Sequence, residues 1–130
     1  MLGGTGSGTY AGVIAGIDWS TAERERTGLP TIISMSLGGG ACRAVNEAID
    51  ASVQAGVHNA VAAGNNAGFD SCLLSPASAS QAFTVAAADI NDDMAFFSNI
   101  GQAWTLHHIL HPHSTPLKTL RPHFNPIQFY

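Results

Sequence analysis

Apolar positions in the first hundred residues change between helical spacing and short strand-like runs. A helix is predicted from Thr9 to about Arg26, with Ser7 or Thr9 as its N-cap and with Gly28 and Pro30 ending it. The positions on its apolar side recur three or four residues apart, at Tyr10, Val13, Ile14, Ile17 and Thr21.

The following segments predict a sheet with helices packed on it. Residues 31–36 are rich in β-branched side chains, which indicates a strand. A second helix carries an apolar stripe over residues 45–53 and ends at Gly56. Residues 57–63 and 83–87 are almost wholly apolar, which is typical of parallel strands covered on both faces. This order of elements predicts an α/β fold of three layers, α/β/α, around a mainly parallel sheet.

Composition and charge exclude several classes of protein for this chain. The chain has 130 residues, the size of one small domain, of which 45% are hydrophobic and 11% charged. It has no apolar run near the roughly 18 residues of a membrane helix, so we expect no membrane span. The formal net charge of -4 offers no basic surface for a phosphate backbone, so we expect no nucleic-acid partner.

The two ends of the chain differ in composition. All the acidic residues precede Met94 and all the glycines lie at or before Gly101, whereas histidine and proline crowd the final stretch. This predicts a boundary near Gly101, between a domain over residues 1–101 and a divergent His- and Pro-rich tail over residues 102–130. We interpret the tail as disordered, or as a frame-shifted or read-through translation, with a real but divergent tail as the alternative. Translating the DNA after codon 101 in the other two frames distinguishes these interpretations.

Two local patterns point to ligand or metal chemistry only weakly. Gly6-Ser7-Gly8 has the glycine spacing of a dinucleotide-binding turn, but the strand before it and the acidic residue after it are missing, which favours a flexible turn beside a helix cap. His107 and His111 have the spacing of a metal pair on a helix, yet Pro112 and the lack of acidic or Cys neighbours argue against a metal site.

The two cysteines do not form a metal motif. Cys42 and Cys72 lie thirty residues apart without ligand spacing, and the sequence leaves open whether they form a disulfide. The first eight residues lack the basic and apolar regions of a secretory signal.

Two predicted strands end in glycine, at the edge where open α/β sheets place their ligand crevice. The first continues into residues 36–40, Ser-Leu-Gly-Gly-Gly, and the second into residues 62–65, Ala-Ala-Gly-Asn. No GxSxG, Walker or HExxH motif accompanies them.

Six short motifs, in order, resemble the middle of the subtilisin-like serine proteases (subtilases), nearest the proteinase K and aqualysin branch. The resemblance covers about residues 2–101. The motifs are Gly6-Ser7-Gly8, Ile14-Ala15-Gly16-Ile17-Asp18-Trp19, Ser36-Leu37-Gly38-Gly39, Ala62-Ala63-Gly64-Asn65, Ser75-Pro76-Ala77-Ser78 and Phe97-Ser98-Asn99-Ile100-Gly101.

The resemblance implies half of a protease substrate cleft, with an extended peptide or protein substrate as the partner. Ser36, Leu37 and Gly38 match the strand that pairs with the substrate backbone. Ala62, Ala63 and Gly64 match the pocket for the side chain before the scissile bond. Asn65 matches the oxyanion-hole asparagine, whose amide stabilises the oxygen that becomes negative in the tetrahedral intermediate. An extracellular location is implied as well.

This chain also departs from the family pattern. No segment matches the family's catalytic Asp, His and Ser motifs, so we expect an incomplete subtilisin-like domain without hydrolytic activity, or alternatively a peptide-binding or decoy protein. Thr105 replaces the family's calcium-binding Asp and the usual partner of Cys72 is missing, so we expect no cofactor. Asn59 stands where relatives place an aliphatic residue, at a cost of roughly 1–3 kcal/mol if it is buried without partners.

Overall fold

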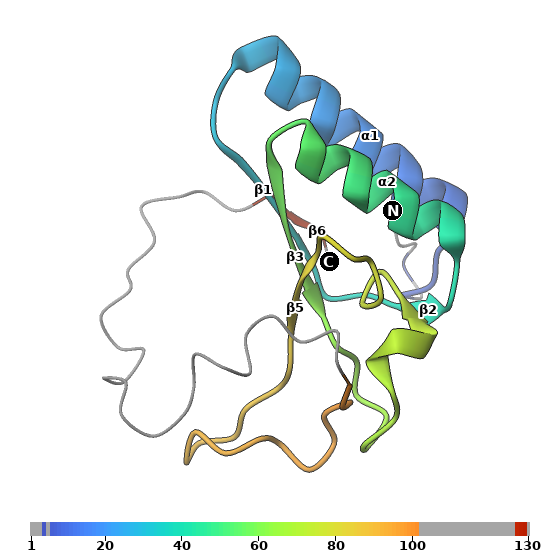
Figure 1. Cartoon of the computed structure of the whole chain (residues 1–130), viewed down its shortest axis with the longest axis vertical. Helices are drawn as coiled ribbons and strands as arrows, with labels where there is room; N and C mark the ends of the chain where they lie inside the picture. Colours follow the sequence, from blue (N-terminus) through green and yellow to red (C-terminus); the bar gives the residue numbers. More distant parts are fainter. Residues whose placement is uncertain (1–3, 5, 102–126, 130) are drawn as a thin grey trace.

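A computed structural model describes residue 4, residues 6–101 and residues 127–129, and shows two helices beside a twisted sheet (Figure 1). The helices and strands, in chain order, are α1 (Tyr10–Thr27), β1 (Thr31–Met35), β2 (Gly39–Gly40), α2 (Arg43–Gln54), β3 (Val57–Ala62), the 3-10 turn η1 (Ser71–Leu73), β4 (Leu74–Ser75), β5 (Phe83–Val85) and β6 (Ile127–Phe129).

The main sheet has the strand order β5-β3-β1-β6, and every pair in it is parallel. Thr31 lies opposite Val57 and Met35 opposite Val61, so β1 and β3 are neighbours and end at the same edge. This confirms the mainly parallel sheet and the predicted strands. A second, antiparallel pair of β2 and β4 was not predicted, and neither was β6, which lies within residues 102–130.

Helix α1 begins and ends where the sequence indicates. The Thr9 side chain accepts a hydrogen bond of 3.1 Å from the backbone N–H of Gly12, which caps the first turn. Gly28 adopts a left-handed φ of 69°, and its N–H donates to the Arg24 carbonyl at 2.9 Å. These contacts satisfy backbone groups that lack partners within the helix, and they confirm the predicted ends.

Long-range contacts change the buried side of α1. Val13 and Ile17 are buried as predicted, together with Ser20, whose hydroxyl donates to the Gly16 carbonyl at 2.9 Å. Tyr10 is instead 42% exposed, and its hydroxyl donates to the Gly40 carbonyl at 2.7 Å. The Tyr10 side chain therefore leaves the predicted apolar stripe and reaches the glycine-rich segment after β1.

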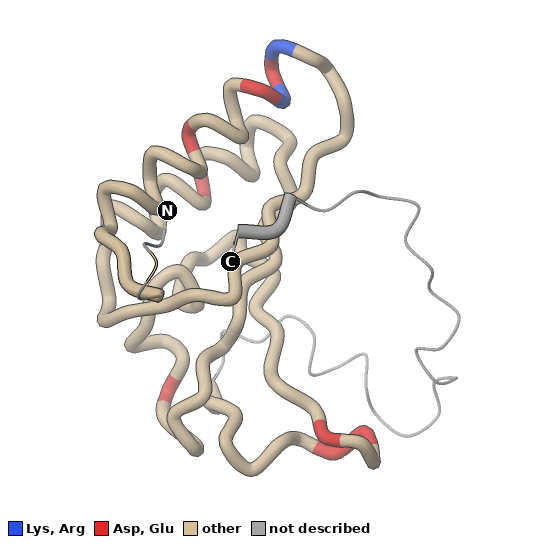
Figure 2. Tube along the Cα trace, turned by 180° about the vertical axis from the view of Figure 1, so that it is seen from behind, with Lys and Arg blue, Asp and Glu red and all other residues tan. Residues whose placement is uncertain are grey.

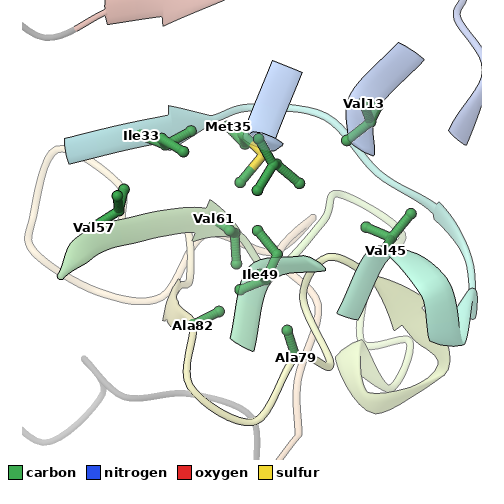
Figure 3. Close-up of a cluster of buried hydrophobic side chains, with 10 residues drawn as sticks. Val13, Ile33, Met35, Val45, Ile49, Val57, Val61, Ala79 and Ala82 are labelled. Carbon is green, nitrogen blue, oxygen red and sulfur yellow. The ribbon is translucent and has the colours of Figure 1, made fainter. Parts of the chain in front are cut away.

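The hydrophobic core lies between the helices and one face of the sheet (Figure 3). Side chains from α1, α2, β1 and β3 meet there, and two alanines close it from the segment before β5. The buried members are Val13, Ile17, Ile33, Met35, Val45, Ile49, Val57, Val61, Ala79 and Ala82.

The other face of the sheet is more open within the described residues. Along β1, Ile33 is fully buried whereas its neighbour Ile32 is 39% exposed, and His58 of β3 is also exposed. This alternation arises because α1 and α2 both lie on one side of the sheet (Figure 1). The described residues thus form two of the three predicted layers, and β3 is not covered on both faces there.

Asn59 points to the buried side of β3 and is 2% exposed. Its Nδ2 donates to Ser52 Oγ on α2 at 2.6 Å, while its Oδ1 has no hydrogen-bond partner among the described residues. The amide group is therefore half satisfied, so the predicted cost of burial applies to the oxygen only.

Charged side chains lie mainly on the helices and in outer loops, and basic positions are visible where α1 ends (Figure 2). There, Arg26 donates to Glu23 at 2.8 Å, and this hydrogen bond holds the pKa of the Glu23 carboxyl below its usual value. In the described part of the chain, neither helix is long and apolar enough to cross a membrane.

Candidate functional site

A groove of about 380 Å³ lies at the shared edge where β1 and β3 end. Six of the seven residues predicted for the site line it, which are Ser36, Leu37, Gly38, Ala62, Gly64 and Asn65. The other lining residues are Gly39, Gly40, Asn66, Leu74, Ser75 and Ala77. The seventh predicted residue, Ala63, is only 1% exposed, and its N–H donates to the Val85 carbonyl at 2.9 Å. Ala63 therefore joins β3 to β5 behind the groove instead of lining it.

The backbone of residues 36–38 is accessible because this segment carries little side-chain bulk. Ser36 and Gly38 are exposed and Leu37 is half-buried. A β-carbon added at Gly38 would lie 3.6 Å from the Ser75 carbonyl oxygen, which is an ordinary contact, so the fold itself does not require glycine there. The missing side chain instead leaves space for a second backbone to approach.

A larger groove of about 700 Å³ is lined in part by the same segment. Residues 6–10 line it together with residues 36–39. The sequence identified Gly6-Ser7-Gly8 as a turn, as a weak nucleotide motif and as the first of the six subtilase-like motifs, but did not predict its place in the groove. The glycines in residues 6–8 and 38–39 are the sequence signal that the two segments can approach each other closely. Only the fold shows that both segments line the same groove.

The loop after β3 presents Asn65 to the smaller groove. Gly64 has a φ of 103°, which suits glycine and turns the chain at the end of the strand. Two backbone hydrogen bonds tie the loop to a later segment: Ala67 N–H donates to the Phe97 carbonyl at 2.9 Å, and Gly68 N–H donates to the Ser98 carbonyl at 3.0 Å. The Asn65 side chain itself is exposed.

The described linings of both grooves carry no charged side chain. They offer backbone N–H and C=O groups, hydroxyls, amides and small apolar surfaces, which suit an uncharged extended chain better than a phosphate or a highly charged ligand. His58 lies on β3 and is absent from both linings, so it does not face the Ser36 hydroxyl across a groove.

Metal-ligating side chains do not gather in the described ranges. No three His, Cys, Asp or Glu residues there form a group suited to a metal ion, and Cys42 and Cys72 are both free thiols. His107, His111 and Thr105 lie outside the described residues.

Comparison with known proteins gives consistent similarities. The model of the subtilase family matches residues 1–115. A subtilisin-like protease of Coccidioides posadasii is 48% identical over 103 residues, covering 78% of this chain and 26% of that protein. Cerevisin of Saccharomyces cerevisiae is 41% identical over 109 residues, covering 78% of this chain and 17% of that protein. The chain thus spans about a quarter or less of the length of these relatives.

A solved structure is similar as well. The crystal structure of a cold adapted subtilisin-like serine proteinase matches with a TM-score of 0.73 and 38% identity, over 80% of this chain and 37% of that one. The similarity to this proteinase therefore extends from the sequence to the arrangement of the helices and the sheet.

Proposed function

Because the chain belongs to the subtilase family and has its incomplete α/β fold, we propose that it supplies one wall of the substrate cleft of a subtilisin-like serine endopeptidase. Its ligand is an extended peptide or protein chain. The observation that supports this most strongly is the shared groove at the ends of β1 and β3, which Gly38 and Asn65 both line.

In this proposal, residues 36–38 bind the substrate backbone by strand addition. Ser36 and Gly38 are exposed, and the missing side chain of Gly38 permits the close approach of a second backbone. The segment contributes to the lining of both grooves, so side chains of a bound peptide have space beside it.

The pocket for the side chain before the scissile bond is assigned to Ala62, Ala63 and Gly64. Ala62 and Gly64 line the smaller groove, and the buried Ala63 fixes the backbone between them. The lining is small and uncharged, which favours uncharged substrate side chains.

Asn65 is assigned to the oxyanion hole. Its amide N–H groups are exposed at the groove, where they would donate to a substrate oxygen that gains negative charge. Removal of one such donor from a subtilisin costs about 2.7–4 kcal/mol of transition-state stabilisation.

We infer that this chain by itself binds peptide without cleaving it, since the 130 residues contain no segment that matches the family's Asp, His and Ser motifs. An extracellular location follows from the same family assignment. No three His, Cys, Asp or Glu side chains converge among the described residues, so we propose no calcium site in that part of the chain.

Fluorescence anisotropy with a labelled, uncharged extended peptide tests the binding. We expect saturable binding by the 130-residue chain and a loss of about tenfold or more in Gly38→Val, because the added side chain occupies the space of the peptide backbone. Ala41→Val is the matched control, since Ala41 is exposed nearby but lines neither groove. Unchanged binding by Gly38→Val would contradict the proposal.

A fluorophosphonate probe separates both non-catalytic interpretations from an active protease. A peptide-binding or decoy protein and an inactive protease segment both bind peptide and remain unlabelled, whereas labelling would contradict the inferred lack of a reactive serine. Peptide hydrolysis by the chain would contradict it as well.

A further inference from the structure

Asn99 is completely buried. The hydrogen-bond partners of its side chain and backbone N–H are residues that come just before and after Asn65 in the sequence. Its Nδ2 donates to the Ala63 carbonyl at 2.9 Å, and its Oδ1 accepts from the backbone N–H of Asn66 at 2.6 Å. Its own backbone N–H donates to the Gly64 carbonyl at 3.0 Å. Asn99 therefore holds the backbone immediately before and after Asn65.

The contacts use the donor and acceptor groups of a primary amide together. Besides the Ala63 carbonyl, Nδ2 donates to Asn66 Oδ1 at 3.3 Å, so the amide nitrogen has two acceptors. A carboxylate would lack these donors, and an aliphatic side chain would leave both the Ala63 carbonyl and the Asn66 N–H unpaired. Asparagine supplies both kinds of group at the length that this position needs.

Gly64 and Asn99 fit each other closely. A β-carbon added at Gly64 would overlap Nδ2 of Asn99, and the positive φ of Gly64 disfavours other residues independently. The buried amide thus approaches the loop backbone at a distance that only glycine allows.

The Asn65 side chain has no comparable support of its own. It is exposed and makes no hydrogen bond to a described residue, so its direction depends on the backbone of residues 64–66. We propose that Asn99 is the positioning residue for Asn65: its buried amide fixes the loop so that the Asn65 side chain faces the groove. This inference rests on the proposed role of Asn65 in the oxyanion hole.

A pair of peptides provides a readout that general destabilisation would not change. The two peptides have the same sequence, but one ends in a carboxylate, which offers an anionic oxygen to Asn65, and the other in the corresponding alcohol. The ratio of their dissociation constants measures the oxyanion contact, while the affinity for the alcohol measures backbone binding along residues 36–38.

We expect the wild-type chain to prefer the carboxylate and Asn65→Ala to abolish this preference. Asn99→Ala should lower the preference by about tenfold, with the affinity for the alcohol changed by less than about twofold, because only the loop loses its support. Asn46→Ala is the matched control: Asn46 is a partly buried asparagine that donates to Ser78 Oγ at 2.9 Å and lies outside both groove linings, and its loss should leave the ratio unchanged.

Asn99→Asp is the variant for the same measurement if Asn99→Ala does not fold. Aspartate keeps the shape of the side chain and an acceptor for the Asn66 N–H but loses the donors to Ala63, so the ratio should again fall. Amide hydrogen exchange measured by NMR should show faster exchange of the Asn66 N–H in Asn99→Ala, by about tenfold or more.

The outcomes separate the two proposals. If Asn65→Ala loses the preference while both Asn99 variants keep it, the positioning role is wrong and the cleft assignment stands. Equal loss of affinity for both peptides in the Asn99 variants would also overturn it, since that result indicates a general structural role. If the wild-type chain binds neither peptide, the proposed function fails, and the role of Asn99 fails with it.

Discussion

Replacing Asn59 by valine should stabilise the chain, although the substitution removes a hydrogen bond. Asn59 is 2% exposed on the helix-facing side of β3, next to core residues at alternate positions of the strand. Its Nδ2 is bonded to Ser52 Oγ, but its Oδ1 lies buried without a partner among the described residues. The two halves of the amide thus act in opposite directions on stability.

The expected change in the free energy of unfolding follows from the unpaired oxygen and the lost hydrogen bond. A buried oxygen without a hydrogen bond costs about 1–3 kcal/mol, whereas the hydrogen bond from Nδ2 contributes about 0.5–1.5 kcal/mol. Ser52 keeps a partner after the substitution, because its hydroxyl donates to the Ile49 carbonyl at 2.8 Å. We expect Asn59→Val to raise the free energy of unfolding by about 1 kcal/mol, and valine also suits a strand better than asparagine.

Urea denaturation followed by circular dichroism measures the effect, and thermal unfolding should show a midpoint higher by about 4 °C. Ser52→Ala in the wild-type chain should destabilise by about 1–3 kcal/mol, since it leaves the Asn59 amide with only the long 3.4 Å hydrogen bond from Nδ2 to the Val57 carbonyl. The same substitution in the Asn59→Val background should cost less. A lower free energy of unfolding in Asn59→Val would refute the reasoning, as would an equal cost of Ser52→Ala in both backgrounds.

Three further substitutions test other parts of the structure. Gly64→Ala should destabilise by about 1–3 kcal/mol, because alanine is strained at a φ of 103°, and urea denaturation measures this cost. Tyr10→Phe should lose about 0.5–1.5 kcal/mol by the same assay, since it removes the 2.7 Å bond to the Gly40 carbonyl; no loss would mean that this contact is not formed in solution. Glu23→Gln should flatten a small pH dependence of the thermal midpoint: the ion pair with Arg26 lowers the pKa of Glu23, so its contribution is present above the ordinary carboxyl pKa and is lost as the pH falls through the lowered one.

Local patterns in the sequence determined the two helices, the strands β1, β3 and β5, and the family. The ends of α1 follow from the Thr9 cap and from Gly28, which act within four residues along the chain. Strands β1 and β3 follow from short apolar runs, and their place as neighbours follows from the rules for parallel sheets. The ordered motifs indicated both glycine-ended strands and Asn65 before the fold was known. The boundary near Gly101 stays a prediction.

Only the tertiary structure decided which distant residues support the site. It placed residues 6–10 in the larger groove, drew Tyr10 away from the apolar side of α1, and joined Asn99 to the loop of Asn65. These contacts join residues thirty or more positions apart, with a separation of 30 for Tyr10 and Gly40 and 33 for Asn66 and Asn99. Hydrophobic periodicity reports contacts within a turn or a strand, so the partners of such long-range hydrogen bonds depend on how the elements pack.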